Sequence, residues 1–181
     1  MTTWLALLRG LNVGGRNRIR MSDRAACFEQ AGDADVRTYI QSGNVVFGAR
    51  GERADLTVAI ERMLADAFDY DATVELRDLA AMRSVVEQAP PGFGSEPDVY
   101  RYDVLFLLPP LAADEVLEAL TPKAGVDIAW PGPGVVYHSR LIARASQSGL
   151  TRIVAHPCYR RMTVRNWNTT SRLLALMDVA D

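Results

Sequence analysis

The chain has 181 residues, and its 49% hydrophobic and 23% charged residues are typical of a globular protein. This composition excludes disordered and collagen-like classes. The longest apolar runs, such as residues 104–113, contain prolines and fall short of the ~20 residues that a membrane span needs, so no membrane partner is expected. The N-terminal residues lack the basic segment and cleavage site of a signal peptide, which predicts a cytoplasmic location.

The net charge of −2 hides an uneven distribution of charge along the chain. Residues 1–22 carry four arginines and residues 128–177 carry seven, with no acidic residue in either segment. Residues 23–127 hold 20 acidic and 9 basic residues. The two basic segments favour an anionic partner. The alternative is that these arginines lie on different faces and pair with the acidic middle of the chain.

The cysteines and histidines predict neither a metal site nor a cofactor. Cys27 and Cys158 are the only cysteines and form no Cys-x-x-Cys motif, so both are expected to be reduced thiols. His138 and His156 are the only histidines, and His156 with Cys158 would supply too few ligands for a closed zinc site. We therefore expect no bound metal and no cofactor.

Hydrophobic periodicity and turn residues predict a β-α-β-β-α-β order in the first half of the chain. A strand over residues 3–9 leads into a loop rich in glycine and arginine, and Ser22 is expected to cap a helix that ends at Gly32. Ser42-Gly43 is expected to be a two-residue hairpin turn, with Asn44 beside it. The other predicted elements are strands over residues 36–41 and 44–49, a helix over 54–68 and a strand over 72–77.

A short helix from Leu79 and a linker rich in proline and glycine over residues 89–98 precede a second copy of this order. The second copy comprises strands over residues 100–108, 126–130, 135–139 and 161–165, a turn over 131–134, helices over 113–120 and 148–155, and a closing helix from about Asn168. The repeated order predicts an α+β fold of two tandem ferredoxin-like (βαββαβ) units with antiparallel sheets and a C-terminal helix. The predicted domains are residues 1–88, with the linking helix, and residues 99–181.

The expected strand order within each unit, 4-1-3-2, places the loop after the first strand beside the hairpin turn. The loop, Gly10-Leu-Asn-Val-Gly-Gly-Arg-Asn, has the glycine spacing of a P-loop, but Arg16 and Asn17 replace the residues that bind phosphate and magnesium. The G-x-G-x-x-G pattern of dinucleotide-binding folds is absent. We therefore expect a polar, positively charged pocket at this end of the sheet rather than a Walker-type hydrolase.

Two further polar motifs can be explained as helix caps. Ser148, in Ser-Gln-Ser-Gly-Leu-Thr, lacks the surroundings of a catalytic serine and fits helix capping. In Arg-Asn-Trp-Asn at residues 165–168, either asparagine can cap the last helix while Trp167 packs in the core, or the segment can contact a ligand. No residue can be assigned as nucleophile or general base, so an enzymatic activity is left open.

Four sequence blocks together resemble a bacterial family catalogued as domain of unknown function 1697. The blocks are ALLRGLNVGG at residues 6–15, YIQSGNVVF at 39–47, SGLT at 148–151 and TVRNWNT at 163–169. The resemblance implies a fold of two α+β subdomains with ferredoxin-like units and implies no established activity. The third block usually reads Ser-Lys-Leu-Thr in the family, so Gly149 stands where a lysine is common.

The leading hypothesis is a cytoplasmic protein that binds a small anionic or phosphorylated ligand through loops rich in arginine, asparagine and glycine. Arginines would pair with the ligand's charge, asparagines would orient it, and glycines would let backbone amides approach. The predicted site residues are Arg9, Asn12, Gly14, Gly15, Arg18, Ser42, Gly43, Asn44, Arg165, Asn166 and Asn168.

Two alternatives belong to other functional classes. A single-stranded nucleic-acid-binding module would use a ferredoxin-like sheet as a stacking platform, although no RNP-type aromatic signature is visible. A ligand-free interaction or assembly module would use the polar blocks only as caps and turns. The oligomeric state and the ligand's identity are not specified by the sequence.

Overall fold

The computed structural model describes residues 1–9, 19–68 and 72–179. The chain divides into two compact units, a first unit of residues 1–82 and 173–181 and a second unit of residues 83–172. The predicted domains differ from these units mainly in the last helix, whose C-terminal part is counted with the first unit.

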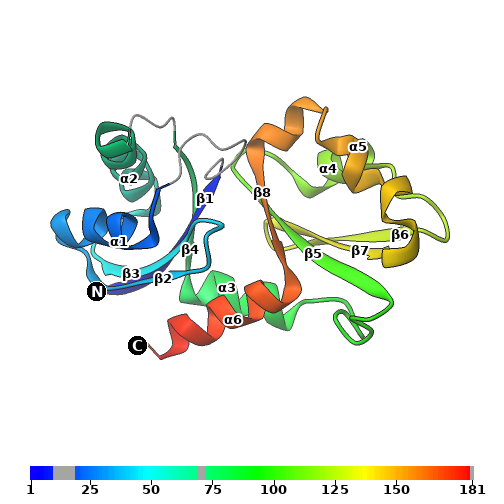
Figure 1. Cartoon of the computed structure of the whole chain (residues 1–181), viewed down its shortest axis with the longest axis horizontal. Coiled ribbons are helices and arrows are strands. Elements are labelled where there is room, and N and C mark those ends of the chain that lie inside the picture. The colour runs from blue at the N-terminus through cyan, green and yellow to red at the C-terminus, as the bar shows by residue number, and fades with distance from the viewer. Residues whose placement is uncertain (10–18, 69–71, 180–181) are drawn as a thin grey trace. The chain divides into compact units, whose positions relative to one another are not determined.

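Each unit repeats the predicted order of strands and helices (Figure 1). The elements up to the linker are β1 (Thr2–Arg9), α1 (Met21–Gln30), β2 (Ala34–Tyr39), β3 (Asn44–Ala49), α2 (Arg53–Phe68), β4 (Thr73–Asp78) and α3 (Leu79–Glu87). The elements after it are β5 (Tyr100–Leu107), α4 (Ala113–Leu120), β6 (Asp127–Gly132), β7 (Val135–Leu141), the 3₁₀ helix η1 (Ile142–Gln147), α5 (Gly149–Ile153), the 3₁₀ helix η2 (Pro157–Arg161), β8 (Met162–Asn166) and α6 (Trp167–Asp178).

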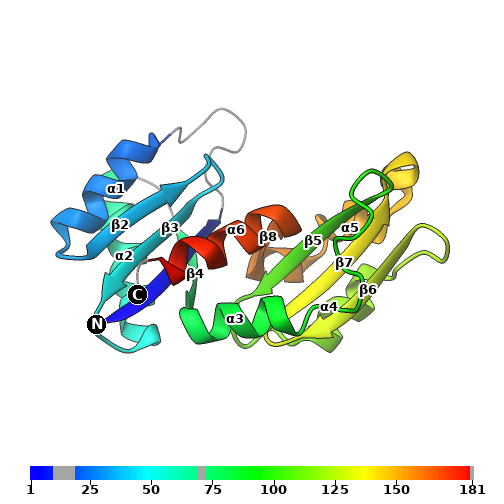
Figure 2. The ribbon, with the colours of Figure 1, turned by 90° about the horizontal axis from the view of Figure 1, so that it is seen from below.

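The two sheets have the same topology, β2-β3-β1-β4 and β6-β7-β5-β8, and every neighbouring pair of strands is antiparallel (Figure 2). This is the predicted 4-1-3-2 order in both units. The prediction of an α+β fold with two βαββαβ units and a C-terminal helix is therefore confirmed. No helix in the described residues is both long and apolar enough to cross a membrane.

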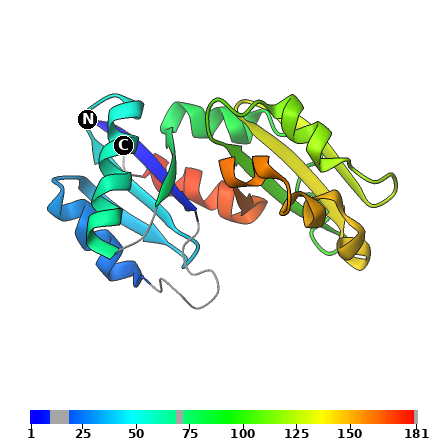
Figure 3. The ribbon, with the colours of Figure 1, turned by 90° about the horizontal axis from the view of Figure 1, so that it is seen from above.

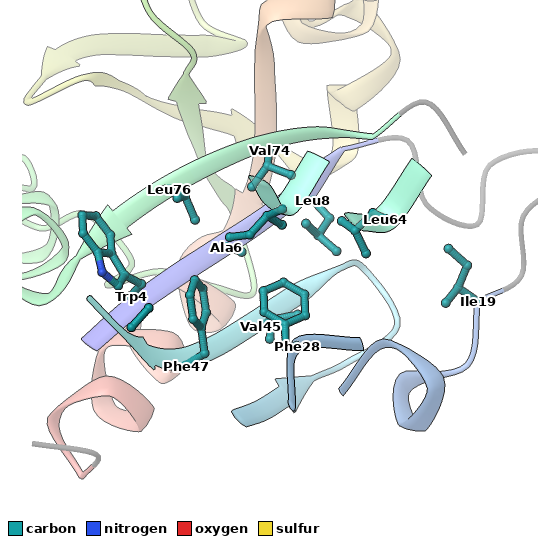
Figure 4. Packing of buried hydrophobic residues seen from close by; sticks show 12 residues of the cluster. Trp4, Ala6, Leu8, Ile19, Phe28, Val45, Phe47, Leu64, Val74 and Leu76 are labelled. Carbon is teal, nitrogen blue, oxygen red and sulfur yellow. The ribbon is translucent and has the colours of Figure 1, made fainter. Parts of the chain in front are cut away.

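The core of the first unit lies between its sheet and the helices α1 and α2 (Figure 3). Alternate residues of β1 point into this layer, as a strand's two-residue period requires, and meet side chains from both helices. Figure 4 shows Trp4, Ala6 and Leu8 of β1 on the same side as Phe28 of α1 and Leu64 of α2. The residues between them on β1 are also buried, so both faces of this strand are covered.

The second unit buries one sheet face under α4 and α5, where Leu105 of β5 packs with Leu120 and Ile153. The other face carries an aromatic cluster around Phe93, which comes from the linker. The rings that Phe93 contacts, at centroid distances of 5.0–6.1 Å, belong to Tyr102, Trp130, Tyr137 and Trp167. The Tyr137 hydroxyl also donates a hydrogen bond of 2.6 Å to the Val85 carbonyl oxygen. These contacts fix the linker and the start of α6 against the sheet.

Three local predictions were wrong in detail. Ser22 does not cap α1, because the helix begins at Met21 and the Ser22 hydroxyl donates to Asp23 instead. The first hairpin loop has four residues, 40–43, because Tyr39 pairs with Asn44 in the ladder. The second hairpin turn is only residues 133–134, because Pro131 and Gly132 continue β6 along its edge. In each case strand pairing or backbone geometry decided the boundary rather than the local residue type.

Candidate functional site

The predicted site residues fall into three groups in the structure. Asn12, Gly14, Gly15 and Arg18 lie in residues 10–18, outside the described part of the chain. Ser42, Gly43 and Asn44, together with Arg9, belong to the first unit, whereas Arg165, Asn166 and Asn168 belong to the second. Each group is therefore described within its own unit.

The turn at residues 40–43 lies beside the end of β1, as the topology predicted. The Leu8 amide donates a hydrogen bond of 2.8 Å to the Gly43 carbonyl oxygen, and Gly43 has a positive φ of 79° that favours glycine. Asn44 is fully buried, and its side-chain amide donates to the Tyr39 carbonyl oxygen at 2.8 Å and to Ser42 Oγ at 3.0 Å. Asn44 therefore holds the turn together.

Arg165 lies along β8 and is only 6% exposed. Its Nη1 donates to Thr163 Oγ1 at 2.7 Å and to the Val164 carbonyl oxygen at 2.8 Å. These bonds hold one end of the guanidinium against its own strand.

Asn166 ends β8 and caps α6, which follows without a loop (Figure 1). Its Oδ1 accepts a hydrogen bond of 2.7 Å from the Thr169 amide, in the geometry of an N-cap. Trp167 packs edge-on against Phe93 at 5.2 Å, and a side chain at Gly94 would collide with the Trp167 ring at 2.4 Å. The predicted cap is therefore confirmed for Asn166, and Trp167 packs against the linker, while a ligand contact by this segment stays a prediction.

A cavity of about 270 Å³ lies at the start of α6, and we call it the edge cavity. It forms because β8 pairs with β5 only as far as Asn166 opposite Asp103, so the first three residues of β5 lack a neighbour on that side. The linker forms the other wall of the cavity. The lining residues are Gly94, Pro97, Tyr100, Arg101, Tyr102, Asp103, Asn166, Trp167 and Asn168.

The edge cavity combines positive and negative groups. Arg101 is exposed at its rim, and Asn166 and Asn168 bring the positive end of the α6 dipole to it. Asp103 is 9% exposed, and its Oδ2 lies 3.4 Å from Arg140 Nη2. Burial raises the pKa of Asp103 above its usual value, although Arg140 opposes the shift.

A buried polar network lies behind Asp103, since His138 is its cross-strand partner on β7. The Nε2 of His138 lies 3.2 Å from Asp127 Oδ2, and the same oxygen accepts hydrogen bonds of 2.7 Å from the Ser148 hydroxyl and the Gly149 amide. Burial lowers the pKa of His138 against the opposing effect of Asp127. Burial alone would raise the pKa of Asp127, but hydrogen bonds, first that of Ser148, lower it overall.

Sequence reasoning placed Ser148 correctly as a helix cap, because its Oγ accepts from the Leu150 amide at 3.1 Å. It did not identify Asp127 or His138 as the partners behind this cap. No sequence motif links these residues, which come together only because β6 and β7 are paired.

A second cluster of buried charges lies in the first unit around Glu75 of β4. Glu75 accepts a hydrogen bond of 2.7 Å from Arg77 Nε and two of 2.9 Å from Arg53 Nη2. A cavity of about 370 Å³ adjoins Arg53 and Arg77, between the start of β1, the end of β4 and the start of α2. Burial raises the pKa of Glu75, whereas Arg77 and Arg53 act to lower it.

Comparison with known proteins places the chain in a family. Residues 1–137 match the family described as "Protein of unknown function (DUF1697)". The chain belongs to this family. The search of curated proteins returned no match.

A solved structure of the conserved bacterial protein SP0830 from Streptococcus pneumoniae is similar along almost the whole chain. The TM-score is 0.85 at 24% sequence identity, and the match covers 97% of this chain and 98% of the other. At this identity the similarity establishes a common fold and carries no inference about activity.

Gly149 has no room for a side chain in this protein. A Cβ there would lie 1.9 Å from the Leu120 carbonyl oxygen, at the end of α4. The Gly149 amide is also used by Asp127. The close packing of α4 against α5 therefore excludes a larger residue at this position.

Within the described residues, no three His, Cys, Asp or Glu side chains are grouped so that they could hold a metal ion. The edge cavity and the first-unit cavity therefore have only charge, hydrogen-bonding groups and aromatic surface to offer a ligand.

Proposed function

We propose that this protein binds a small anionic ligand and that the edge cavity of the second unit is its binding site. The proposal keeps two of the sequence-predicted residues, Asn166 and Asn168, and adds Arg101, which the sequence did not single out. Arg101 was missed because Tyr-Arg-Tyr-Asp reads as an ordinary strand start, and only the end of β8 opposite Asp103 leaves this part of β5 uncovered.

One observation carries the proposal: an arginine and a helix N-terminus line the same cavity. The first amides of an α-helix have no acceptor within the helix, and the helix dipole favours negative charge at this end. Asn166 satisfies the amide of Thr169, which leaves the earlier amides of Trp167 and Asn168 at the cavity without an acceptor in the helix. Arg101 adds a full positive charge that can bind phosphate or carboxylate through two hydrogen bonds.

The size of the edge cavity supports a small ligand. Its volume, about 270 Å³, is slightly below the range of roughly 300–1,000 Å³ for pockets that hold drug-sized molecules. The Trp167 ring is fixed by Phe93 and Gly94, so the start of α6 is held in place before a ligand arrives. A preorganised site of this kind loses little conformational entropy on binding.

Titration with ethyl phosphate, followed by thermal shift and calorimetry, tests the proposal on the full chain. We expect a saturable rise of a few degrees in melting temperature, because binding to the folded state stabilises it. Arg101→Gln should weaken binding about tenfold, the loss of one charge-assisted contact. Arg160→Gln removes the same charge from an exposed position outside the cavity and should bind like the wild type. Equal binding by Arg101→Gln and the wild type would contradict the proposal.

The loop at residues 10–18 and the turn at 42–44 stay part of the original prediction, and Arg9→Gln tests them separately. If the loop contributes to the same ligand, Arg9→Gln should weaken ethyl phosphate binding as Arg101→Gln does. Unchanged binding would reject the loop's role and leave the edge cavity as the site. A parallel titration with a short single-stranded RNA at two salt concentrations tests the alternative, since phosphate-dominated nucleic-acid binding falls steeply with salt.

A further inference from the structure

Three positively charged side chains from different segments of the second unit lie along one loop, which joins α4 to β6. Arg152 of α5 donates hydrogen bonds of 3.3 and 3.4 Å to the carbonyl oxygen and Oγ1 of Thr121, at the start of this loop. Arg144 of η1 donates a hydrogen bond of 3.3 Å to the Gly125 carbonyl oxygen, near its end. Lys123 lies between these two positions in the loop. We call these three cations the basic row.

The basic row lies on the surface, and its charges are close to one another. Lys123 Nζ and Arg144 Nη2 donate hydrogen bonds of 3.0 and 3.1 Å to the same oxygen, Gln147 Oε1. All three cations are exposed, and none of them lines the edge cavity or the first-unit cavity. The basic row therefore presents concentrated positive charge to solvent, outside both cavities.

No carboxylate forms an ion pair with the basic row in the part of the chain that the structure describes. Asp127, just after the loop, is fully buried, and its side chain accepts hydrogen bonds from the Ser148 hydroxyl and the Gly149 amide. A guanidinium has five N–H donors and an ammonium group three, so the hydrogen bonds of the basic row leave donors for an anion. For Arg144 and Arg152, the structure therefore favours an anionic partner over pairing with the acidic middle of the chain.

We infer that the basic row binds the phosphate backbone of a single-stranded nucleic acid. The inference goes beyond the proposed function, because it concerns a surface outside the edge cavity. Residues 121–125 span at most about 14 Å, a length over which a nucleic-acid strand carries two or more phosphates. Cations spread along a loop match successive phosphates better than the single charged group of a small metabolite. A single strand can bend to follow them, whereas a duplex is stiff over this length.

Fluorescence anisotropy of a labelled oligouridine of about eight nucleotides tests the inference on the full chain. A protein cation that neutralises a phosphate releases counterions, so the logarithm of the association constant should fall linearly with the logarithm of the salt concentration. The slope is about −0.7 for each phosphate neutralised on a single strand. We therefore expect a slope of about −2 for the wild type, the value for three cations.

Lys123→Gln tests the basic row with little disturbance to the loop, because the Lys123 ammonium bonds to the Gln147 side chain rather than to the backbone. It should weaken oligouridine binding about five- to tenfold at about 50 mM salt and reduce the slope by about 0.7. Arg152→Gln should have the same effect, and Lys123→Arg, which keeps the charge, should bind like the wild type. Arg62→Gln is the matched control, because it removes an exposed positive charge from the first unit. Circular dichroism and the melting temperature verify folding.

Weaker oligouridine binding by Lys123→Gln and Arg152→Gln, with ethyl phosphate binding unchanged, would support the inference. Equal oligouridine affinities of these variants and the wild type would overturn it, because the strand would then bind elsewhere on the protein. The inference would also be overturned if the wild type binds no oligouridine at low salt, or binds phosphatidylserine vesicles instead. If ethyl phosphate does not bind, the proposed function fails and this inference stands, because Arg101 lies outside the basic row.

Discussion

In both units, the last residue of the fourth strand caps the helix that follows. Asp78 ends β4 opposite Trp4, and Asn166 ends β8 opposite Asp103. Each caps the following helix by accepting a hydrogen bond of 2.7 Å from the amide three residues later. Each unit also has a cavity beside this cap, at the start of its first strand.

The polar groups near the two cavities are satisfied differently. Glu75 of the first unit accepts hydrogen bonds from both Arg53 and Arg77. Asp103 of the second unit has only Arg140, at 3.4 Å, and a buried oxygen without a hydrogen-bond donor among the described residues. The same backbone arrangement therefore supports a fully hydrogen-bonded carboxylate in one unit and a more weakly paired carboxylate in the other.

The largest expected effect comes from neutralising the carboxylate in each unit. Glu75→Gln should lower the free energy of unfolding by about 3 kcal/mol or more, because Arg77 stays buried without this carboxylate. Asp103→Asn should change it by less than about 1 kcal/mol, because the ion pair of Asp103 with Arg140, at 3.4 Å, makes no hydrogen bond to Oδ2 that the substitution could remove. Urea denaturation of both variants measures the difference. Equal losses would mean that Asp103 is as fully paired as Glu75, which would remove the contrast between the two cavities.

Replacing Gly149 should be the next most damaging change. Gly149→Ala places a Cβ against the Leu120 carbonyl oxygen, and overpacking a rigid backbone contact costs on the order of 3 kcal/mol. The matched control is Gly48→Ala in the first unit, where the new Cβ would lie 3.2 Å from the end of the flexible Met1 side chain and 3.6 Å, an ordinary contact distance, from Ala34 Cβ. Thermal unfolding should show a large decrease for Gly149→Ala and a small one for the control. A small decrease in both would show that α4 and α5 can separate.

His138 should make stability depend on pH in the second unit. Burial keeps its folded-state pKa below the ordinary value of 6.5. As pH falls through 6.5, the unfolded chain binds a proton that the folded chain does not, so stability decreases. His138→Gln should remove this part of the decrease between pH 7.5 and pH 5.5. An unchanged profile would show that Asp127 and Asp103, which neighbour His138, offset the cost of charging it.

The topology could be predicted from the sequence because the strands, helices and turns that compose it can be recognised from local residue patterns. Alternating apolar residues and the glycine at position 43 set the strands and the first hairpin, and both units then adopt the 4-1-3-2 order. Ser22 was misassigned because the helix begins one residue earlier, and a hydroxyl near a helix start does not by itself define the cap.

The candidate site could be predicted only in part. Asn166 and Asn168 stood out because they flank a helix start, whereas Arg101 and Asp103 belong to an ordinary strand pattern. Their position in a cavity depends on where β8 stops pairing with β5, which is a property of two segments about sixty residues apart. The weak pairing of Asp103 likewise depends on the 3.4 Å separation from Arg140, and no sequence pattern encodes such a distance.

The smallest expected effect comes from removing the helix cap that ends the fourth strand of each unit. Asp78→Ala and Asn166→Ala should each lower the free energy of unfolding by about 1 kcal/mol, the usual loss for an N-cap. Ser22→Ala is the matched control, because Ser22 lies at a helix start without capping it, and should leave stability unchanged. If Asn166→Ala costs nothing while Asp78→Ala costs the expected amount, Asn166 is held for the ligand rather than for the helix. Ethyl phosphate titration of Asn166→Ala then separates the two roles, because a cap alone would reduce stability and affinity together through fraying of the first turn, whereas a ligand contact would reduce affinity only.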